Sequence, residues 1–393
     1  METHFPTIFF ISEEAFTMSG NMHWASVWGN AISIGENRPE SYNKNLTFRY
    51  PVYSQFGGKA LRLTFDNYCG TEPVTLTRTT VNVDGVFYPV MFGGKREVTI
   101  PAGENTVSDE LPCEIMPQSL IIVSFYFEDF TQLRSAVYTS GPLTEGIYAI
   151  GDMTEVDIIP QDIARGINII YFLSNISLLT SSENRTVVCY GDSITAQDWP
   201  EYLTLRCNRE EKLRTAVIRR AASGTRMLRE YSCITYESYG LMGVKRFEHE
   251  VPTDGADTVI IQHGINDIIH PVGREVNPFR PMSDMPSAEE LIDFMMFYIR
   301  KAREFGYKVY VGTLLPIEGW RTYAPFRDEV RCAFNDWIRT TDLIDGCIDF
   351  DAALRDPERP SRFLPEYDSG DHLHPSKAGY KRMADIVPGE ILR

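Results

Sequence analysis

Residues suited to acyl-transfer chemistry occur at four separate places in the second half of the chain. Ser193, Gly224 and Asn266 each follow a different run of apolar residues, and Asp371 and His374 lie three residues apart near the C-terminus. A serine nucleophile needs a base, a group that orients the base, and hydrogen-bond donors for the oxyanion. These residue types supply every one of those roles.

The elements that must position these residues form a regular pattern from about residue 185 onward. Strand-like runs are expected at 187–190, 215–218, 258–262, 309–311 and 347–350. Helices are expected near 199–207, from Ser287 to Gly306 behind a capping box, over 325–339, and after Pro375. This alternation predicts a parallel sheet with helices on both faces. Because the carboxyl ends of parallel strands share one edge, the four places can meet there.

The first half of the chain has a different pattern. Short alternating or apolar runs recur between turn residues, at 59–65, 74–76, 97–100, 120–127 and 167–179. Runs of this kind predict an all-β sandwich or jelly roll. A polar link at 180–184 separates the two patterns, so we expect a β-sandwich domain over 1–182 and an α/β domain over 183–393.

Composition limits the classes of partner. The chain has 54 acidic and 38 basic residues among 393, a net charge of −16, which disfavours nucleic-acid and anionic membrane surfaces. No apolar run approaches the length of a membrane helix, and no basic residue precedes Arg38, so we expect a cytoplasmic protein without a signal peptide. Seven scattered cysteines without a paired spacing predict neither a disulfide framework nor a zinc site.

Four sequence blocks together resemble the SGNH (GDSL-type) hydrolase superfamily. They are Gly-Asp-Ser at 191–193, Gly224, Gly-Ile-Asn-Asp at 264–267 and Asp-His-Leu-His at 371–374, in the family's order. Segments 56–62, 92–94 and 100–103 also resemble two-domain bacterial members with a β-sandwich before the hydrolase domain. The resemblance implies a flavodoxin-like, three-layer α/β/α hydrolase domain preceded by that sandwich.

The resemblance also implies a role for each block residue. Ser193 would be the nucleophile, His374 its general base, and Asp371 the group that orients the imidazole. The backbone amides of Ser193 and Gly224 and the side chain of Asn266 would donate to the oxyanion. This chemistry uses no cofactor and no metal.

Each of these residues has a structural alternative when it is taken alone. Ser193 could cap a helix, Gly224 could be a turn glycine, and Asn266 could be a strand-to-helix cap. Asp371, His372 and His374 could be read as metal ligands, but no further ligand cluster supports that interpretation. We interpret the neighbouring acids Asp192 and Asp267 as structural residues.

Residues that contact the substrate are harder to identify. The loop at 315–323 contains Trp320, which could stack on a sugar or aryl group, and Arg321, which could bind a carboxylate. Trp199 could line the pocket, although for all three residues packing is the favoured interpretation. Thr225 stands where related sequences often have asparagine, and Arg219-Arg220 is unusual for the preceding strand, so we expect an atypical pocket here.

The sequence therefore predicts a carboxylic ester hydrolase that removes short acyl groups, acetyl in particular, from a carbohydrate or a similar small ester. An arylesterase, lipase or thioesterase of the same superfamily is the alternative. A carbohydrate-binding protein built on an inactive hydrolase fold is the alternative from another class. The predicted partner is a small-molecule or oligosaccharide ester, and the oligomeric state and the role of the sandwich stay open.

Overall fold

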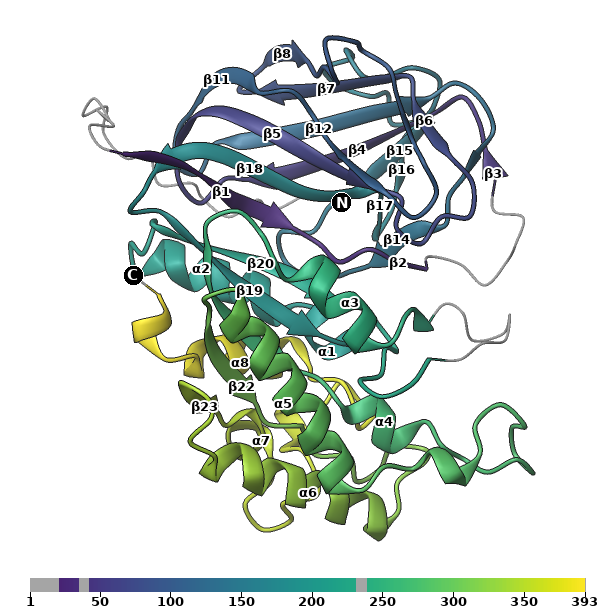
Figure 1. Cartoon of the computed structure of the whole chain (residues 1–393), viewed down its shortest axis with the longest axis vertical. Helices are drawn as coiled ribbons and strands as arrows, with labels where there is room; N and C mark the ends of the chain where they lie inside the picture. The colour runs from purple at the N-terminus through teal and green to yellow at the C-terminus, as the bar shows by residue number, and fades with distance from the viewer. Residues whose placement is uncertain (1–20, 35–41, 231–238, 393) are drawn as a thin grey trace.

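The computed structural model describes residues 21–34, 42–230 and 239–392. Figure 1 shows a strand-rich half, drawn from purple through blue to teal, packed against a mixed half that runs from teal to yellow. The last strand of the first half ends at Ser181, and the first strand of the second half begins at Arg185. The expected fold class, a parallel α/β sheet preceded by antiparallel β-structure, is confirmed. The boundary between 182 and 183 stays a prediction.

Two antiparallel sheets form most of the N-terminal half. One has the order β1-β18-β5-β10, with β11 also paired to β5: β1 (Met22–Gly29), β18 (Leu173–Ser181), β5 (Gly58–Asp66), β10 (Asn105–Val107) and β11 (Leu111–Ile115). The other has the order β16-β15-β4-β12-β7-β8: β16 (Arg165–Gly166), β15 (Ile147–Ile150), β4 (Leu46–Tyr53), β12 (Leu120–Phe127), β7 (Arg78–Val83) and β8 (Val86–Pro89). Short pairings add β2 (Ser33–Ile34), β3 (Tyr42–Asn43), β6 (Val74–Leu76), β9 (Val98–Ile100), β13 (Thr131–Gln132), β14 (Ser135–Tyr138) and β17 (Ile169–Tyr171).

The alternating residues of the long strands form the core of this half. In β12, Ile121, Val123 and Phe125 are fully buried, because successive side chains of a strand point to opposite faces. Phe125 packs at 5.1 Å, centroid to centroid, against Phe65 of β5 in the other sheet. The two sheets therefore enclose one hydrophobic core.

The C-terminal half contains a five-stranded parallel sheet in the order β20-β19-β21-β22-β23. Its strands are β19 (Arg185–Gly191), β20 (Thr215–Ala221), β21 (Ala256–Gln262), β22 (Lys308–Gly312) and β23 (Gly346–Ile348). In chain order this is 2-1-3-4-5, the flavodoxin-like arrangement, in which ligands bind between the first and third strands. Those strands are β19 and β21, which precede Ser193 and Asn266.

Helices connect these strands and pack as two groups. The α-helices are α1 (Ser193–Ala196), α2 (Trp199–Arg209), α3 (Gly243–Glu250), α4 (Ile265–Ile269), α5 (Ala288–Glu304), α6 (Pro325–Thr340), α7 (Phe350–Leu354) and α8 (Lys377–Ile386). Short 3₁₀ turns are η2 (Met282–Asp284), η3 (Pro365–Tyr367) and η4 (Gly389–Ile391). Helix α8 contacts α2 and α7, whereas α5 contacts α3 and α6. Within the described ranges, no helix combines the length and the apolar character that crossing a bilayer requires.

Two local predictions show why helices begin where they do. The capping box at Ser287 is present, since its hydroxyl accepts from the Glu290 amide and its amide donates to the Glu290 carboxylate. The strand expected over 347–350 is wrong at its end. Asp349 accepts from the amide of Ala352 and caps α7, so Phe350 is helical.

Strand β20 forms the edge of the parallel sheet, and β1 of the sandwich lies against it. Arg220 of β20 is buried and donates to the carbonyl of Ser174 at 2.6 Å and to the side-chain oxygen of Asn175 at 2.8 Å. Both acceptors belong to sandwich strand β18. The expectation that Arg219-Arg220 alters the pocket is therefore corrected for Arg220, whose guanidinium binds the sandwich.

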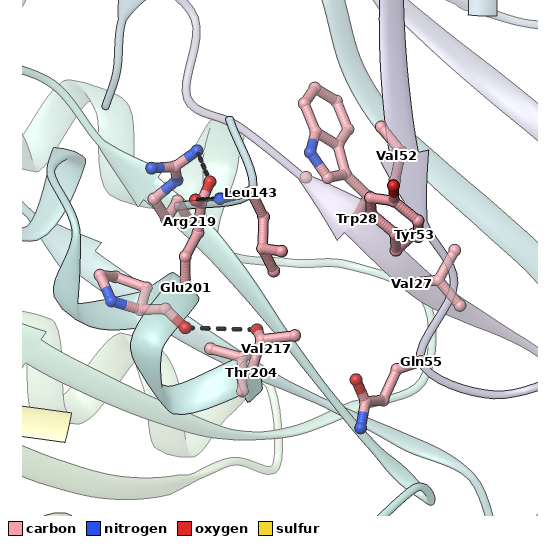
Figure 2. A pocket seen from close by; sticks show the side chains of 12 residues that line it. Val27, Trp28, Val52, Tyr53, Gln55, Leu143, Glu201, Thr204, Val217 and Arg219 are labelled. Atoms are coloured by element: carbon pink, nitrogen blue, oxygen red, sulfur yellow. Dashed lines mark hydrogen bonds and ion pairs between the residues drawn. The ribbon is translucent and has the colours of Figure 1, made fainter. Parts of the chain in front are cut away.

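Arg219 makes further contacts between the sandwich and the α/β half. Its guanidinium pairs with Glu201 of α2 at 2.8 Å and donates to the carbonyl of Ser140 at 2.7 Å. Figure 2 shows this pair beside a cavity of about 40 Å³ that is also lined by Trp28 and Tyr53 of the sandwich. Arg219 thus also serves the contact between the two halves.

Candidate active site

Ser193 lies at the C-terminal end of β19, as the first residue of α1. The helix cap is the residue before it, because the Asp192 carboxylate accepts from the amide of Ile194 at 3.1 Å. The Ser193 side chain is therefore not needed as a cap. It is 8% exposed and points to another residue far away in the sequence.

That distant residue is His374. The Ser193 Oγ lies 2.9 Å from His374 Nε2, and His374 Nδ1 lies 2.7 Å from Asp371 Oδ2. The loop before α8 holds this geometry, since the other oxygen of Asp371 accepts from the amides of Leu373 and His374 at 2.9 and 2.8 Å. The structure thus brings together the three residues that the sequence assigns to nucleophile, base and orienting acid.

Hydrogen bonds stabilise the negatively charged form of Asp371 beside the His374 imidazole. Burial alone would raise the pKa of this carboxyl group. Hydrogen bonds from the His374 ring and from two backbone amides outweigh burial and hold the pKa well below its usual range. Asp371 is consequently a carboxylate that can accept a hydrogen bond from Nδ1–H of His374.

The residues expected at the oxyanion site follow the strands on either side of β19. Gly224 follows β20 and has a φ of +75°, a left-handed conformation that glycine adopts at low cost. Asn266 is in α4, directly after β21, and is 3% exposed. The amide of Ala222 donates to the carbonyl of Gly191 at 3.2 Å, which ties the Gly224 turn to the strand end that carries Ser193.

Thr225 orients the Asn266 side chain, a role that the sequence did not reveal. The Thr225 carbonyl accepts from Asn266 Nδ2 at 3.0 Å, which leaves the second hydrogen of that amide for another acceptor. The same carbonyl accepts from His263 Nε2 at 3.1 Å, and the Thr225 hydroxyl accepts from Arg246 at 3.0 Å. The sequence signal was that Thr225 stands where related sequences often have asparagine.

His263 is held in its neutral form. Complete burial, and then the charge of Arg246, lower its pKa to about 3. Its Nδ1 lies 3.2 Å from the hydroxyl of Tyr298, so both ring nitrogens have partners in the core. A neutral ring whose Nε2–H donates to the Thr225 carbonyl fits this arrangement.

The two acids interpreted as structural are buried beside the site. Asp267 accepts from the amides of Met227 and Leu228 at 2.8 and 3.0 Å, and so holds the loop that follows Gly224. Burial raises the pKa of Asp192 to about 7, although the hydrogen bond from Ile194 acts in the opposite direction. These contacts agree with structural roles for both residues.

Trp199 is not available to a substrate. Its ring is 0% exposed, packs at 5.5 Å against Phe350, and donates from Nε1 to Thr195 at 3.4 Å. The possible substrate contact is thereby corrected: helix packing encloses the ring. Trp320 is half-buried, while Arg321 is exposed with its guanidinium 4.6 Å from the centre of the Trp320 ring.

The histidines of the 371–374 block take separate carboxylates. His372 Nδ1 lies 2.6 Å from Asp368, whereas His374 binds Asp371. Among the described side chains, no group of three or more His, Cys, Asp or Glu residues is arranged to hold a metal ion. The expectation of a metal-free site stays a prediction.

Comparison with known proteins assigns the second half of the chain to a family. Residues 189–382 match the model of the GDSL-like lipase/acylhydrolase family. No curated protein matches the chain.

Solved structures also resemble about half of the chain. A GDSL-like lipase from Bacteroides thetaiotaomicron is 20% identical, with 51% of this chain and 85% of that chain covered and a TM-score of 0.34. A lipase/acylhydrolase from Enterococcus faecalis is 18% identical, with coverages of 53% and 95% and a TM-score of 0.38. A catalytic mutant of an acetylxylan esterase from Geobacillus stearothermophilus is 18% identical, with coverages of 51% and 91% and a TM-score of 0.38.

These likenesses, at such identities and TM-scores, do not bear on the substrate. The family match confirms the predicted SGNH (GDSL-type) relationship and the prediction of an ester hydrolase. The chain therefore carries, over residues 189–382, a hydrolase domain of the GDSL-like lipase/acylhydrolase family.

Proposed function

We propose that this protein is a serine esterase that removes short acyl groups, acetyl in particular, from the hydroxyl groups of a carbohydrate or a similar small alcohol. One observation carries the proposal. Ser193, His374 and Asp371 form a continuous hydrogen-bonded series, with distances of 2.9 and 2.7 Å, in a domain of a hydrolase family. Such a series lets a neutral serine attack an ester at neutral pH.

In the first step, Ser193 Oγ attacks the ester carbonyl while His374 Nε2 takes its proton. A positioned general base contributes about 10²–10⁴ in rate. The Asp371 carboxylate accepts from Nδ1–H, which fixes the tautomer that leaves Nε2 free as a base and then stabilises the imidazolium.

The tetrahedral intermediate carries its negative charge on the former carbonyl oxygen. In this proposal the backbone amides of Ser193 and Gly224 and the second Nδ2 hydrogen of Asn266 donate to that oxygen. The Thr225 carbonyl holds the Asn266 amide before the substrate arrives, so little reorganisation is needed in the transition state.

The intermediate collapses when His374 returns its proton to the leaving alcohol oxygen, which leaves the acyl group on Ser193. Water then attacks the acyl-enzyme, and His374 removes a proton from that water. A second collapse breaks the bond to Ser193 Oγ, which regains its proton, and releases the carboxylic acid. The preference for a short acyl group rests on the absence from the sequence of a long apolar lid or interfacial segment.

Hydrolysis of nitrophenyl acetate, butyrate and octanoate tests the proposal. We expect the highest kcat/KM on acetate or butyrate, and a loss of about 10³-fold or more in Ser193→Ala. Ser54→Ala is a matched control, because that sandwich hydroxyl donates to the carbonyl of Met116 at 3.0 Å and lies outside the site. A maximum on octanoate would favour a lipase or thioesterase.

A fluorophosphonate probe separates the esterase from a binding protein. We expect covalent labelling on Ser193, detected by peptide mass spectrometry, and no labelling of Ser193→Ala. A folded protein that neither labels at Ser193 nor hydrolyses these esters would favour a carbohydrate-binding protein on an inactive hydrolase fold.

A further inference from the structure

Arg321 is an exposed cation that the structure fixes beside the proposed oxyanion site. Its neighbour Thr322 donates to the carbonyl of Ile269 at 2.8 Å. Ile269 is the last residue of α4, the helix that carries Asn266. The 315–323 loop is therefore bound to the same short helix as the Asn266 side chain.

Contacts around the site place Arg321 between the two ends of the catalytic machinery. On one side, the ring of Tyr239 lies against Gly224 and stacks on His270 at 4.9 Å. His270 directly follows α4. On the other side, Gly319 packs so closely on His372 that a Cβ there would lie 2.6 Å from the imidazole Cγ. His372 is two residues from His374, so Arg321 lies on the rim that joins the oxyanion side to the base.

Glu318, the acidic residue of the 315–323 loop, is already paired with other side chains. Glu318 binds Arg359 at 2.5 Å and Arg362 at 3.1 Å, and it also accepts from Ser361. Arg321 itself has no carboxylate within ion-pair distance among the described residues, and its guanidinium rests over the Trp320 ring. An arginine so placed presents hydrogen-bond donors to an incoming anion.

The charge of Arg321 reaches the oxyanion side of the site. The net charge is −16, yet the charges of Arg226, Arg280 and Arg321 all act on His270. Burial is the largest cause that lowers the pKa of His270, and these three charges lower it further. Arg226 is buried with Asp267 at 3.7 Å, whereas Arg321 is exposed to an incoming anion.

We infer that Arg321, supported on the Trp320 ring, binds a carboxylate on the alcohol part of the substrate, so that the preferred substrate is an acylated acidic sugar. The inference rests on the proposed esterase function. The short acyl group occupies the space between Ser193 and the oxyanion donors, and the sugar extends over the rim. The carboxylate then reaches the guanidinium, with two parallel N–H donors available for its two oxygens.

Two acetylated sugars that differ in one group provide the test. One is an acetylated uronic acid, and the other is the same compound with its carboxyl group as a neutral primary amide. We expect the wild-type protein to prefer the acid by about tenfold in kcat/KM at low salt, through a lower KM. The preference should shrink as the ionic strength rises, because salt screens an exposed ion pair.

Variants then assign the preference to Arg321. Arg321→Gln should reduce the acid-to-amide ratio of kcat/KM to near one, and Arg321→Lys should keep part of it. Lys308→Gln is the matched control. It also removes one exposed positive charge. Lys308 is the first residue of β22, so it lies at the N-terminal ends of the strands, whereas the proposed site lies at their C-terminal ends. Its ratio should equal that of the wild-type protein.

An unchanged ratio in Arg321→Gln, or a wild-type protein that does not favour the acid, would overturn the inference. If nitrophenyl acetate is hydrolysed and Ser193 is labelled while neither sugar ester reacts, the acidic-sugar inference fails and the esterase function stands. If Ser193 is not labelled and no ester is hydrolysed, the esterase function fails together with the inference.

Discussion

Replacement of Asn266 by alanine removes the side-chain donor of the proposed oxyanion site. The structure separates two consequences of this change, because the Asn266 amide has two hydrogens. One donates to the Thr225 carbonyl at 3.0 Å in the resting protein. The other is available to the oxyanion, which exists only during the reaction. The variant therefore tests ground-state and transition-state interactions at once.

The expected magnitudes differ strongly. Loss of the bond to Thr225 should lower the free energy of unfolding by about 1 kcal/mol, a typical net value for one hydrogen bond. The Thr225 carbonyl is not left unpaired, because His263 Nε2 still donates to it at 3.1 Å. Loss of the oxyanion donor should raise the activation free energy by about 3–4 kcal/mol, which lowers kcat by about 10²–10³ with little change in KM.

Steady-state hydrolysis of nitrophenyl acetate gives kcat and KM, and urea unfolding gives the stability. The matched control is Asn82→Ala in the sandwich, where the lost bond is the one that Asn82 Oδ1 accepts from the amide of Gly85 at 2.9 Å. We expect a similar stability loss of about 1 kcal/mol in this control with kcat unchanged. A kcat for Asn266→Ala within threefold of the wild-type value would refute the assignment of Asn266 to the oxyanion site.

Three further substitutions follow from the geometry. Asp371→Asn should lower kcat by about 10³–10⁴, because an amide N–H turned toward the His374 ring favours the wrong tautomer; kcat at pH 8 measures this. Gly224→Ala should cost about 1–3 kcal/mol of stability in urea unfolding and at least tenfold in kcat, because φ is +75° and the new Cβ would lie 2.4 Å from the Tyr239 ring. The folded pKa of Asp192 is raised to about 7, so its contribution to stability is present below about pH 4 and is lost as the pH rises through 7. Asp192→Asn should thus gain about 2–3 kcal/mol of stability relative to the wild-type protein between pH 5 and pH 8, measured by urea unfolding. A stability difference that is equal at both pH values would contradict this.

The positions of the site residues were predictable because their signals are local. Each of Ser193, Gly224 and Asn266 follows a short apolar run, and short apolar runs bounded by turn residues favour buried strands. The parallel arrangement then determines that strand ends far apart in sequence share one edge. His374 follows no strand, and its place at that edge could be expected from the resemblance alone.

Other contacts depend on partners that no periodicity encodes. The pattern of β20 gives no sign that Arg220 donates to residues 174 and 175. Thr225 looks like a substitution within the glycine block, and its role appears only when Asn266 and His263 are seen on one carbonyl. An aromatic residue such as Trp199 has the same sequence signature in a core as in a binding site, and only the packing of α2 against Phe350 of α7 shows that it is buried.

The contact between sandwich strand β1 and β20 of the parallel sheet explains how the sandwich supports the hydrolase half. An edge strand presents unpaired backbone groups and is usually protected. Here β1 lies against β20, and Gly29 of β1 passes so close that a Cβ would lie 3.1 Å from Ile218. Ala216 of β20 and Ala222, which directly follows the strand, pack within the hydrophobic cluster of the sandwich. Because β20 leads directly into the Gly224 turn, the sandwich supports one of the two strands that flank the nucleophile strand, and through it the backbone of the proposed oxyanion site.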